Sequence, residues 1–143
     1  MRLNQTAEYA LRVMAYLATQ DNQEPIKSKE LAKTTGIPLF YLSKIMRRLV
    51  VAGLVQSQKG HGGGFTLAKP RSEIHFIDII QSVSSEFSTK RCVFGYARCG
   101  DENPCPLHPT WKILRNQILS WANKFTLEDV AKGEPIELPD DVV

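Results

Sequence analysis

The sequence contains no apolar run long enough to cross a membrane. Its longest run, from Leu49 to Val55, spans seven residues and is interrupted by Gly53, whereas a membrane-spanning helix needs about 20 consecutive apolar residues. The first residues, MRLNQTAEYALR, lack the apolar stretch and the small-residue cleavage site of a secretory signal. We therefore expect a cytoplasmic protein that does not cross a membrane.

The motifs of common enzyme classes are also missing. The chain has no Ser, His and Asp in the order of a hydrolase triad, no CxxC and no cofactor-binding loop. The glycine-rich stretch GHGGG lacks the GK[ST] ending and the strand-to-helix setting of a nucleotide-binding loop. With 143 residues, of which 43% are hydrophobic and 23% charged, the composition is that of a globular protein of about one domain. We do not expect an enzyme.

Acidic residues are absent from a long central segment. Between Glu30 and Glu73 lie seven basic residues and no Asp or Glu. Residues 1–71 hold 11 basic and 4 acidic residues, or +7, whereas residues 72–143 hold 7 and 11, or −4. This asymmetry favours a polyanionic partner, and a solvated basic face is the alternative interpretation.

Hydrophobic spacing and capping residues predict three helices in residues 1–53. Apolar residues recur every three or four positions in a first segment, which predicts a helix that ends near Gln20. Ser28 is expected to cap a second helix over 29–35, and Gly36 suits its left-handed end. A third helix is expected over 38–53, because proline suits the first turn of a helix.

A β-hairpin is predicted after the third helix. Two short strand-like runs, LVQSQ and FTLAK, flank the glycine-rich stretch KGHGGG. Helix, helix, tight turn, helix and basic hairpin is the order of a winged helix-turn-helix. The predicted fold class is therefore mainly α with a small β-hairpin wing.

The third helix is expected to have one face in the core and one face on DNA. The residues expected to pack inward are Leu42, Ile45, Met46 and Leu49. The opposite face and the hairpin tip are expected to contact base edges and phosphates. The predicted DNA-binding residues are Ser28, Phe40, Ser43, Lys44, Arg47, Arg48, Lys59 and His61. An ordinary solvated helix face is the alternative for Lys44 and Arg47.

The second half of the chain is predicted to add a short amphipathic helix, EIHFIDIIQSV, and a long helix. An apolar stripe on the long helix has the period of one helix packed along another. Its members are Trp111, Leu114, Ile118, Trp121 and Phe125. A core helix has the same period, but two tryptophans in so small a chain favour a homodimer. Thr126 and Asp129 are expected to cap a last short helix.

These patterns divide the chain into four regions. We expect a winged helix-turn-helix domain over 1–83, a cysteine-rich loop over 84–109, and a dimerisation helix with a short cap helix over 110–131. The remaining residues, 132–143, contain the acidic, proline-punctuated sequence EPIELPDDVV, which is typical of a flexible tail.

All three cysteines lie in one segment, RCVFGYARCGDENPCPLHP, as Cys92, Cys99 and Cys105. Its glycines and prolines prevent a regular helix, so the segment can fold its thiols around one centre. The odd number of cysteines and the reducing cytoplasm disfavour a disulfide. Together with His108, the thiols suit either a Cys3His zinc site or an iron-sulfur cluster, and the spacing does not decide between them.

Several segments occur here in the order of one bacterial family, namely MRLNQTAEYALRVMAYLA, GIPLFYLSKIMRRLVVAGLV, KGHGGGFTLAKP, the cysteine segment and NKFTLEDV. From Met1 to about Val130 the chain resembles the IscR/NsrR-type family of bacterial winged-helix transcription regulators. The resemblance implies a homodimer that binds palindromic operators in double-stranded DNA. It also implies one iron-sulfur cluster per protomer, 2Fe–2S or 4Fe–4S, with Cys92, Cys99 and Cys105 as ligands.

The resemblance offers two candidates for the fourth ligand. Some members use a histidine shortly after the third cysteine, which His108 matches. Others use an acid from the first helix of the opposite subunit, and Glu8 stands in that place; its alternative is a helical pair with Arg12, worth about 0.2–0.5 kcal/mol. Six residues separate Cys92 from Cys99 where five is common, so the cluster type stays open.

We therefore predict a dimeric DNA-binding regulator that senses iron-sulfur status, redox state or nitric oxide through its cluster. One alternative keeps the winged helix but makes the cysteine segment a structural zinc site or an unmetallated thiol switch. A small iron-sulfur redox protein is the alternative from another class, and it leaves the basic winged helix without a role.

Overall fold

The computed structural model describes residues 3–85 and 92–133. The part of the predicted tail beyond Gly133 lies outside these residues. The described elements are α1 (Gln5–Ala18), α2 (Ser28–Thr35), α3 (Leu39–Val51), β1 (Val55–Gln58), β2 (Gly64–Leu67), the 3-10 turn η1 (Arg71–Glu73), α4 (Phe76–Val83), α5 (His108–Lys124) and α6 (Leu127–Ala131). None of the described helices has the length and apolar character needed to span a bilayer.

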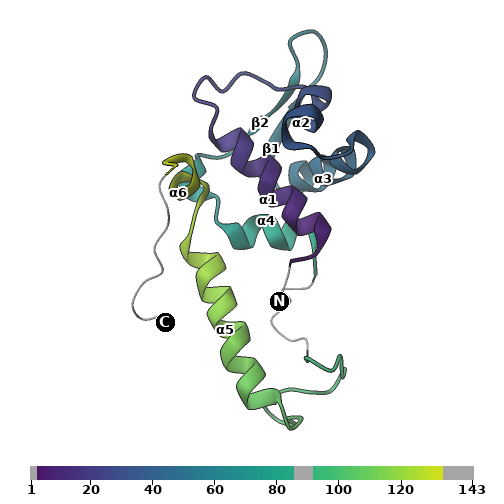
Figure 1. Cartoon of the computed structure of the whole chain (residues 1–143), viewed down its shortest axis with the longest axis vertical. Coiled ribbons are helices and arrows are strands. Elements are labelled where there is room, and N and C mark those ends of the chain that lie inside the picture. Colours follow the sequence, from purple (N-terminus) through teal and green to yellow (C-terminus); the bar gives the residue numbers. More distant parts are fainter. Residues whose placement is uncertain (1–2, 86–91, 134–143) are drawn as a thin grey trace.

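The elements form a helical body from which one long helix projects. In the body, α1 and α4 lie at the centre, with α2, α3 and the hairpin at one end (Figure 1). Helix α5 extends away from the opposite end and carries the cysteine segment at its far tip (Figure 1). The mainly α fold with a two-stranded antiparallel wing confirms the predicted fold class.

The hydrophobic core is built from the inward faces of α1, α3 and α4. On α3, the side chains that the sequence places inward are each at most 1% exposed, which confirms the prediction: Leu42, Ile45, Met46 and Leu49. Six side chains of α1 and four of α4 are buried against them. Burying an aliphatic side chain of this size contributes about 1.5–3 kcal/mol to stability. The outward face of α3 is thereby left in solvent.

The predicted cap of the second helix is wrong. Ser28 is the first residue of α2, and Lys27 occupies the cap position without a side-chain hydrogen bond. The cause is a short backbone pairing upstream, where Ile26 and Phe65 exchange N–H···O bonds of 3.1 and 2.9 Å. This pairing fixes the chain in an extended conformation just before Lys27, so the helix begins at Ser28. The predicted left-handed end at Gly36 is confirmed, with φ of 70°.

The wing is a hairpin in which Val55 pairs with Leu67 and Gln58 with Gly64. Gly64 has φ of 145°, and a Cβ at this position would lie 2.5 Å from the backbone of Ile26. Only glycine therefore allows the close approach between the wing and the segment before α2.

The end of α5 is anchored to the body by backbone bonds. The N–H of Phe76 donates to Phe125 at 3.1 Å, and the N–H of Leu127 donates to Ile74 at 3.0 Å. The predicted cap of the last helix is confirmed, because the N–H of Thr126 donates to the Asp129 carboxylate at 2.9 Å.

At the C-terminal end of α5, the predicted apolar stripe packs against the core of the same chain. Trp121 packs edge-on against Phe76 with ring centroids 5.5 Å apart, and Phe125 is buried. Toward the start of the helix, Leu114 is exposed, as is Ile113, which the stripe does not include. The helical period alone could not show which part of the stripe packs in the core and which part is exposed, because a core helix and a dimerisation helix have the same spacing of apolar residues.

The burial of α3 yields a stability prediction. We expect Leu49→Ala to lower the free energy of unfolding by about 2–5 kcal/mol, because it leaves a cavity in the core. Val51→Ala, on the exposed face of the same helix, should change it by less than about 0.5 kcal/mol. Urea denaturation followed by circular dichroism measures both, and equal losses would contradict the assigned faces of α3.

Candidate metal centre and DNA-binding surface

The exposed face of α3 carries half of the predicted DNA-binding residues. Phe40, Ser43, Lys44 and Arg47 are all exposed on it. The Lys44 ammonium lies over the Phe40 ring, 4.3 Å from its centroid. This cation–π contact holds a positive charge against an apolar surface at the outer edge of the helix.

Arg48 is placed differently from its neighbour Arg47. Its guanidinium donates to the Val83 carbonyl at 2.9 Å, which ties α3 to the end of α4. Sequence analysis missed this contact, because nothing in the local pattern links two residues 35 positions apart. Lys44, Arg47 and Arg48 nevertheless share one hollow of about 530 Å³ between α3 and Ser82 of α4.

The remaining predicted DNA contacts lie at the same end of the molecule. Lys59 and His61 are exposed at the tip of the wing, and Ser28 is half-buried at the start of α2. Figure 1 shows α2, α3 and the hairpin together at the end opposite to the tip of α5. The cysteine segment and this basic surface are thus at the two ends of the chain's long axis.

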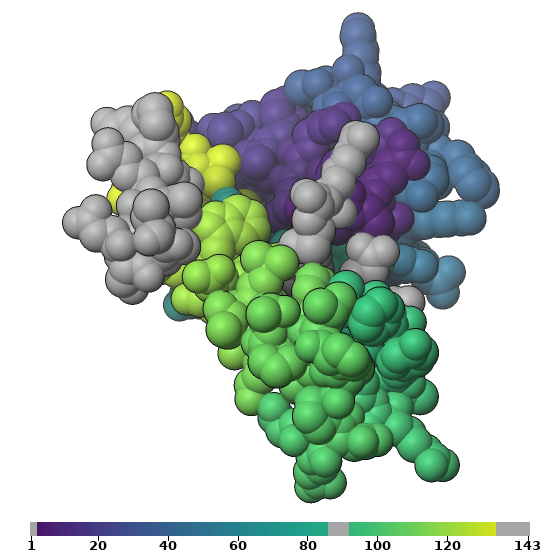
Figure 2. Space-filling model, turned by 60° about the horizontal axis from the view of Figure 1, so that its bottom comes forward, coloured from purple at the N-terminus to yellow at the C-terminus, as the bar shows by residue number. Residues whose placement is uncertain are grey.

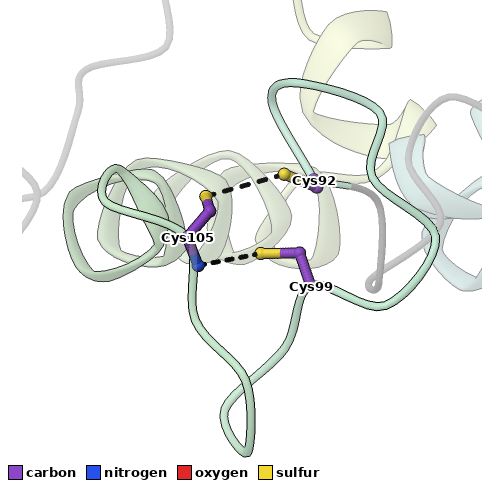
Figure 3. A group of neighbouring side chains, drawn as sticks. All are labelled: Cys92, Cys99 and Cys105. Atoms are coloured by element: carbon purple, nitrogen blue, oxygen red, sulfur yellow. Dashed lines mark hydrogen bonds between the residues drawn. The ribbon is translucent and has the colours of Figure 1, made fainter.

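The three cysteines converge just before α5. The Sγ atoms of Cys92 and Cys105 are 3.7 Å apart, and the Cys105 N–H donates to Cys99 Sγ at 3.4 Å (Figure 3). All three sulfur atoms lie within 4.8 Å of one another. Cys92 is buried, whereas Cys99 and Cys105 are partly accessible. The prediction that this segment gathers its thiols around one centre is confirmed.

His108 lies beside the thiols as the first residue of α5. Its imidazole is 8% exposed, with Nδ1 3.4 Å from Cys99 Sγ and Nε2 3.3 Å from the Asp101 carboxylate. Asp101 also accepts a 2.7 Å bond from Lys112 of α5. A carboxylate on the far nitrogen of a histidine is the usual way to orient a metal-binding imidazole. Sequence analysis missed Asp101, although its position two residues after Cys99 is a usable signal.

Glu8 is not brought to the thiols within this chain. It is half-buried on α1, and the ligand group that assembles among the described residues consists of the three cysteines alone. A ligand supplied by a second subunit is not tested by a single chain, so Glu8 stays a prediction.

The donor set fits a metal centre. Two thiolates on one tetrahedral zinc ion, with Zn–S bonds of about 2.3 Å, lie about 3.8 Å apart. The separation between Cys92 and Cys105 is 3.7 Å. Thiolate ligands also hold iron-sulfur clusters. The three sulfurs can therefore bind a metal ion or an iron-sulfur cluster without a change of donor type.

Residues 3–133 match the family model Rrf2, which is described as an iron-dependent transcriptional regulator. The chain belongs to the Rrf2 family. An HTH-type transcriptional regulator of Aquifex aeolicus is 35% identical over 136 residues, covering 94% of both chains. The HTH-type transcriptional regulator IscR of Photorhabdus laumondii is 30% identical, covering 95% of this chain and 82% of that protein.

The structure of CymR, the global cysteine regulator of B. subtilis, matches this chain with a TM-score of 0.78 at 24% identity, over 94% and 99% of the two chains. The match places the observed helices and hairpin in the winged-helix architecture of Rrf2 regulators. As a member of this family the chain is a DNA-binding transcription regulator and not an enzyme.

In this Rrf2 protein the surroundings shift the pKa values of Cys92 and Cys99 in opposite directions. Desolvation raises the pKa of Cys92, but hydrogen bonds from the backbone of Phe94 and Tyr96, together with those from the Cys99 and Cys105 side chains, outweigh it, so the pKa lies below its ordinary value. A bond from the Cys105 backbone lowers the pKa of Cys99, yet desolvation and the neighbouring thiols raise it on balance. One thiol is thus favoured as a thiolate while close neighbours resist a second negative charge.

The Asp101 contact yields a prediction for metal binding. We expect Asp101→Asn to weaken Zn²⁺ binding by about 10- to 100-fold, because an amide orients the His108 ring and supports its basicity less well. Glu102→Gln removes the same charge from the adjacent exposed residue and should leave the affinity unchanged. Competition titration with a chromogenic chelator measures both affinities. Equal affinities for the two variants would show that His108 is not held for the metal by Asp101.

Proposed function

We propose that this Rrf2 regulator acts as a homodimer whose DNA binding is controlled by an iron-sulfur cluster held by Cys92, Cys99 and Cys105. The observation that carries the proposal is the convergence of three thiols within 4.8 Å directly before the long helix α5. The iron-dependent description of the family and the likeness to IscR favour iron over zinc. When bound, such a cluster supplies a redox-active anionic centre whose loss or oxidation changes the local charge.

His108 is the fourth ligand that this chain supports best. Its Nδ1 faces Cys99 Sγ at 3.4 Å, and its Nε2 is held by Asp101. The ring is almost fully buried, so its orientation is fixed before a metal arrives. Glu8 of the partner subunit is the alternative, and the two assignments differ in whether one chain alone can complete the site.

The partner on the basic surface is double-stranded DNA with a palindromic operator. Lys44 and Arg47 project from the exposed face of α3, where they can reach base edges and phosphates in the major groove. Lys59 and His61 at the wing tip can hold flanking phosphates. A dimer of such units requires half-sites about one helical turn apart.

The dimer contact is assigned to the outer part of α5. Leu107, Ile113 and Leu114 are between 45% and 63% exposed there, and Trp111 and Ile118 are half-buried. Figure 2 shows this part of the chain protruding from the body. Residues 1–83 would then form the DNA-binding domain, and the cysteine segment over 84–109 would lie close to the contact between subunits.

A regulator with a structural zinc ion is the second candidate. The 3.7 Å separation between two of the sulfurs matches a single tetrahedral ion directly. Analysis of iron, acid-labile sulfide and zinc in protein purified without oxygen separates the two candidates.

The contrast between Arg47 and Arg48 tests the DNA-binding surface. We expect Arg47→Ala to weaken binding to a DNA site selected from a random duplex library by about 1–3 kcal/mol per contact, with the metal content unchanged. Arg48→Ala removes the same charge, but it also breaks the bond to Val83, so it should lower the free energy of unfolding as well.

Fluorescence anisotropy at several salt concentrations measures the DNA affinity, and denaturant titration measures the stability. Full affinity of Arg47→Ala for the selected site would contradict the assignment of α3 as the reading helix.

A further inference from the structure

Arg71 lies where the wing returns to the body and bonds to two other elements. It is the first residue of η1, four positions after the end of β2. Its Nε donates to the Glu128 carboxylate of α6 at 2.7 Å, and its Nη1 donates to the Ala18 carbonyl at the end of α1 at 2.8 Å. The Asp21 carboxylate lies 3.9 Å from the same guanidinium. One side chain thus joins the base of the wing to α1 and α6.

Helix α6 is tied closely to α5 because the connection between them is short and anchored. Only Phe125 and Thr126 separate the two helices. This connection pairs with the segment before α4, through the bonds of Phe125 to Phe76 and of Leu127 to Ile74. A shift of the C-terminal end of α5 is therefore passed to α6 and so to Glu128.

A groove separates the base of the wing from α6. Its volume is about 470 Å³, and Arg71 and Glu128 both line it. Lys69 also lines the groove from the wing side, as an exposed residue. The Arg71–Glu128 bond therefore lies at the edge of this groove, beside the contacts that α6 makes with η1 and α1.

We propose that Arg71 is a positioning residue for the wing, which it couples to the α5–α6 unit through Glu128. The proposed metal centre lies at the start of α5, and the wing lies at the other end of the molecule. Through this bond, a displacement of α5 and α6 would reach the base of the wing. The coupling part of this inference rests on the proposed function, whereas the positioning part does not.

Charge chemistry suits this role. A guanidinium to carboxylate bond is stronger and more directional than a neutral hydrogen bond. Both side chains are 35% exposed, so the fold does not depend on them as it does on a buried ion pair. Removal of either partner should therefore loosen the link between the wing base and α6 without unfolding the body.

The test uses two variants that break the same bond with opposite changes in charge. Arg71→Gln removes a positive charge and Glu128→Gln removes a negative one, so their effects on attraction to DNA oppose each other. Lys69→Gln is the matched control, because it removes a positive charge from the wing base. Thermal denaturation confirms that each variant is folded.

Hydrogen exchange of the β2 amides in the full-length protein reports the position and order of the wing directly. We expect about tenfold faster exchange in Arg71→Gln and in Glu128→Gln, and no change in Lys69→Gln. Unchanged exchange in Glu128→Gln would overturn the proposal, whatever the metal does.

Affinity for the selected DNA site, with and without bound metal, tests the coupling. We expect both Arg71→Gln and Glu128→Gln to reduce the ratio of the two affinities by about 2- to 30-fold. A wild-type ratio of one would refute the proposed sensing but leave the positioning role to be decided by hydrogen exchange. A normal ratio in both variants would refute the coupling through Arg71.

Discussion

The approach of three sulfur atoms to one another before α5 is the constraint on which the rest of the site depends. Two of these thiols differ in acidity, because the pKa of Cys92 is lowered while desolvation and the neighbouring thiols raise that of Cys99. The local backbone supports the arrangement, since N–H groups favour the Cys92 thiolate and bond to Cys99 Sγ. His108 lies beside Cys99 Sγ, and Asp101 contacts the other ring nitrogen of this histidine. In the proposed function, a metal held at the start of α5 changes the charge there.

The fold connects that place to the DNA-binding surface through few rigid contacts. Helix α5 projects from the body, and only its C-terminal end packs against α4, where Trp121 meets Phe76. The short pairing after α5 and the Arg71–Glu128 bond continue the connection toward the wing. In the proposed coupling, a change at the start of α5 biases the orientation of α3 and the wing.

Much of this architecture could be predicted from the sequence. The inward face of α3, the hairpin and the cap at Thr126 follow local periodicity and turn chemistry, and the structure confirms them. The start of α2 and the bond of Arg48 to Val83 could not be predicted, because both depend on pairing between distant segments. Contacts in the cysteine segment are limited in the same way, because those set by the folded path of the chain cannot be predicted from local sequence. Cysteine clustering predicted the thiol group, but the contact of Asp101 with His108 depends on the path of the folded loop.

The central claim is that a metal at the three thiols controls how the protein binds DNA. The most direct measurement compares the affinity of anaerobically purified, iron-containing protein for the selected DNA site before and after the metal is removed by a chelator, with Cys99→Ala as the control. The account predicts a change of about 5- to 150-fold on metal removal, and no response to the chelator in Cys99→Ala. Equal affinity of the metal-containing and metal-free wild-type protein would contradict it.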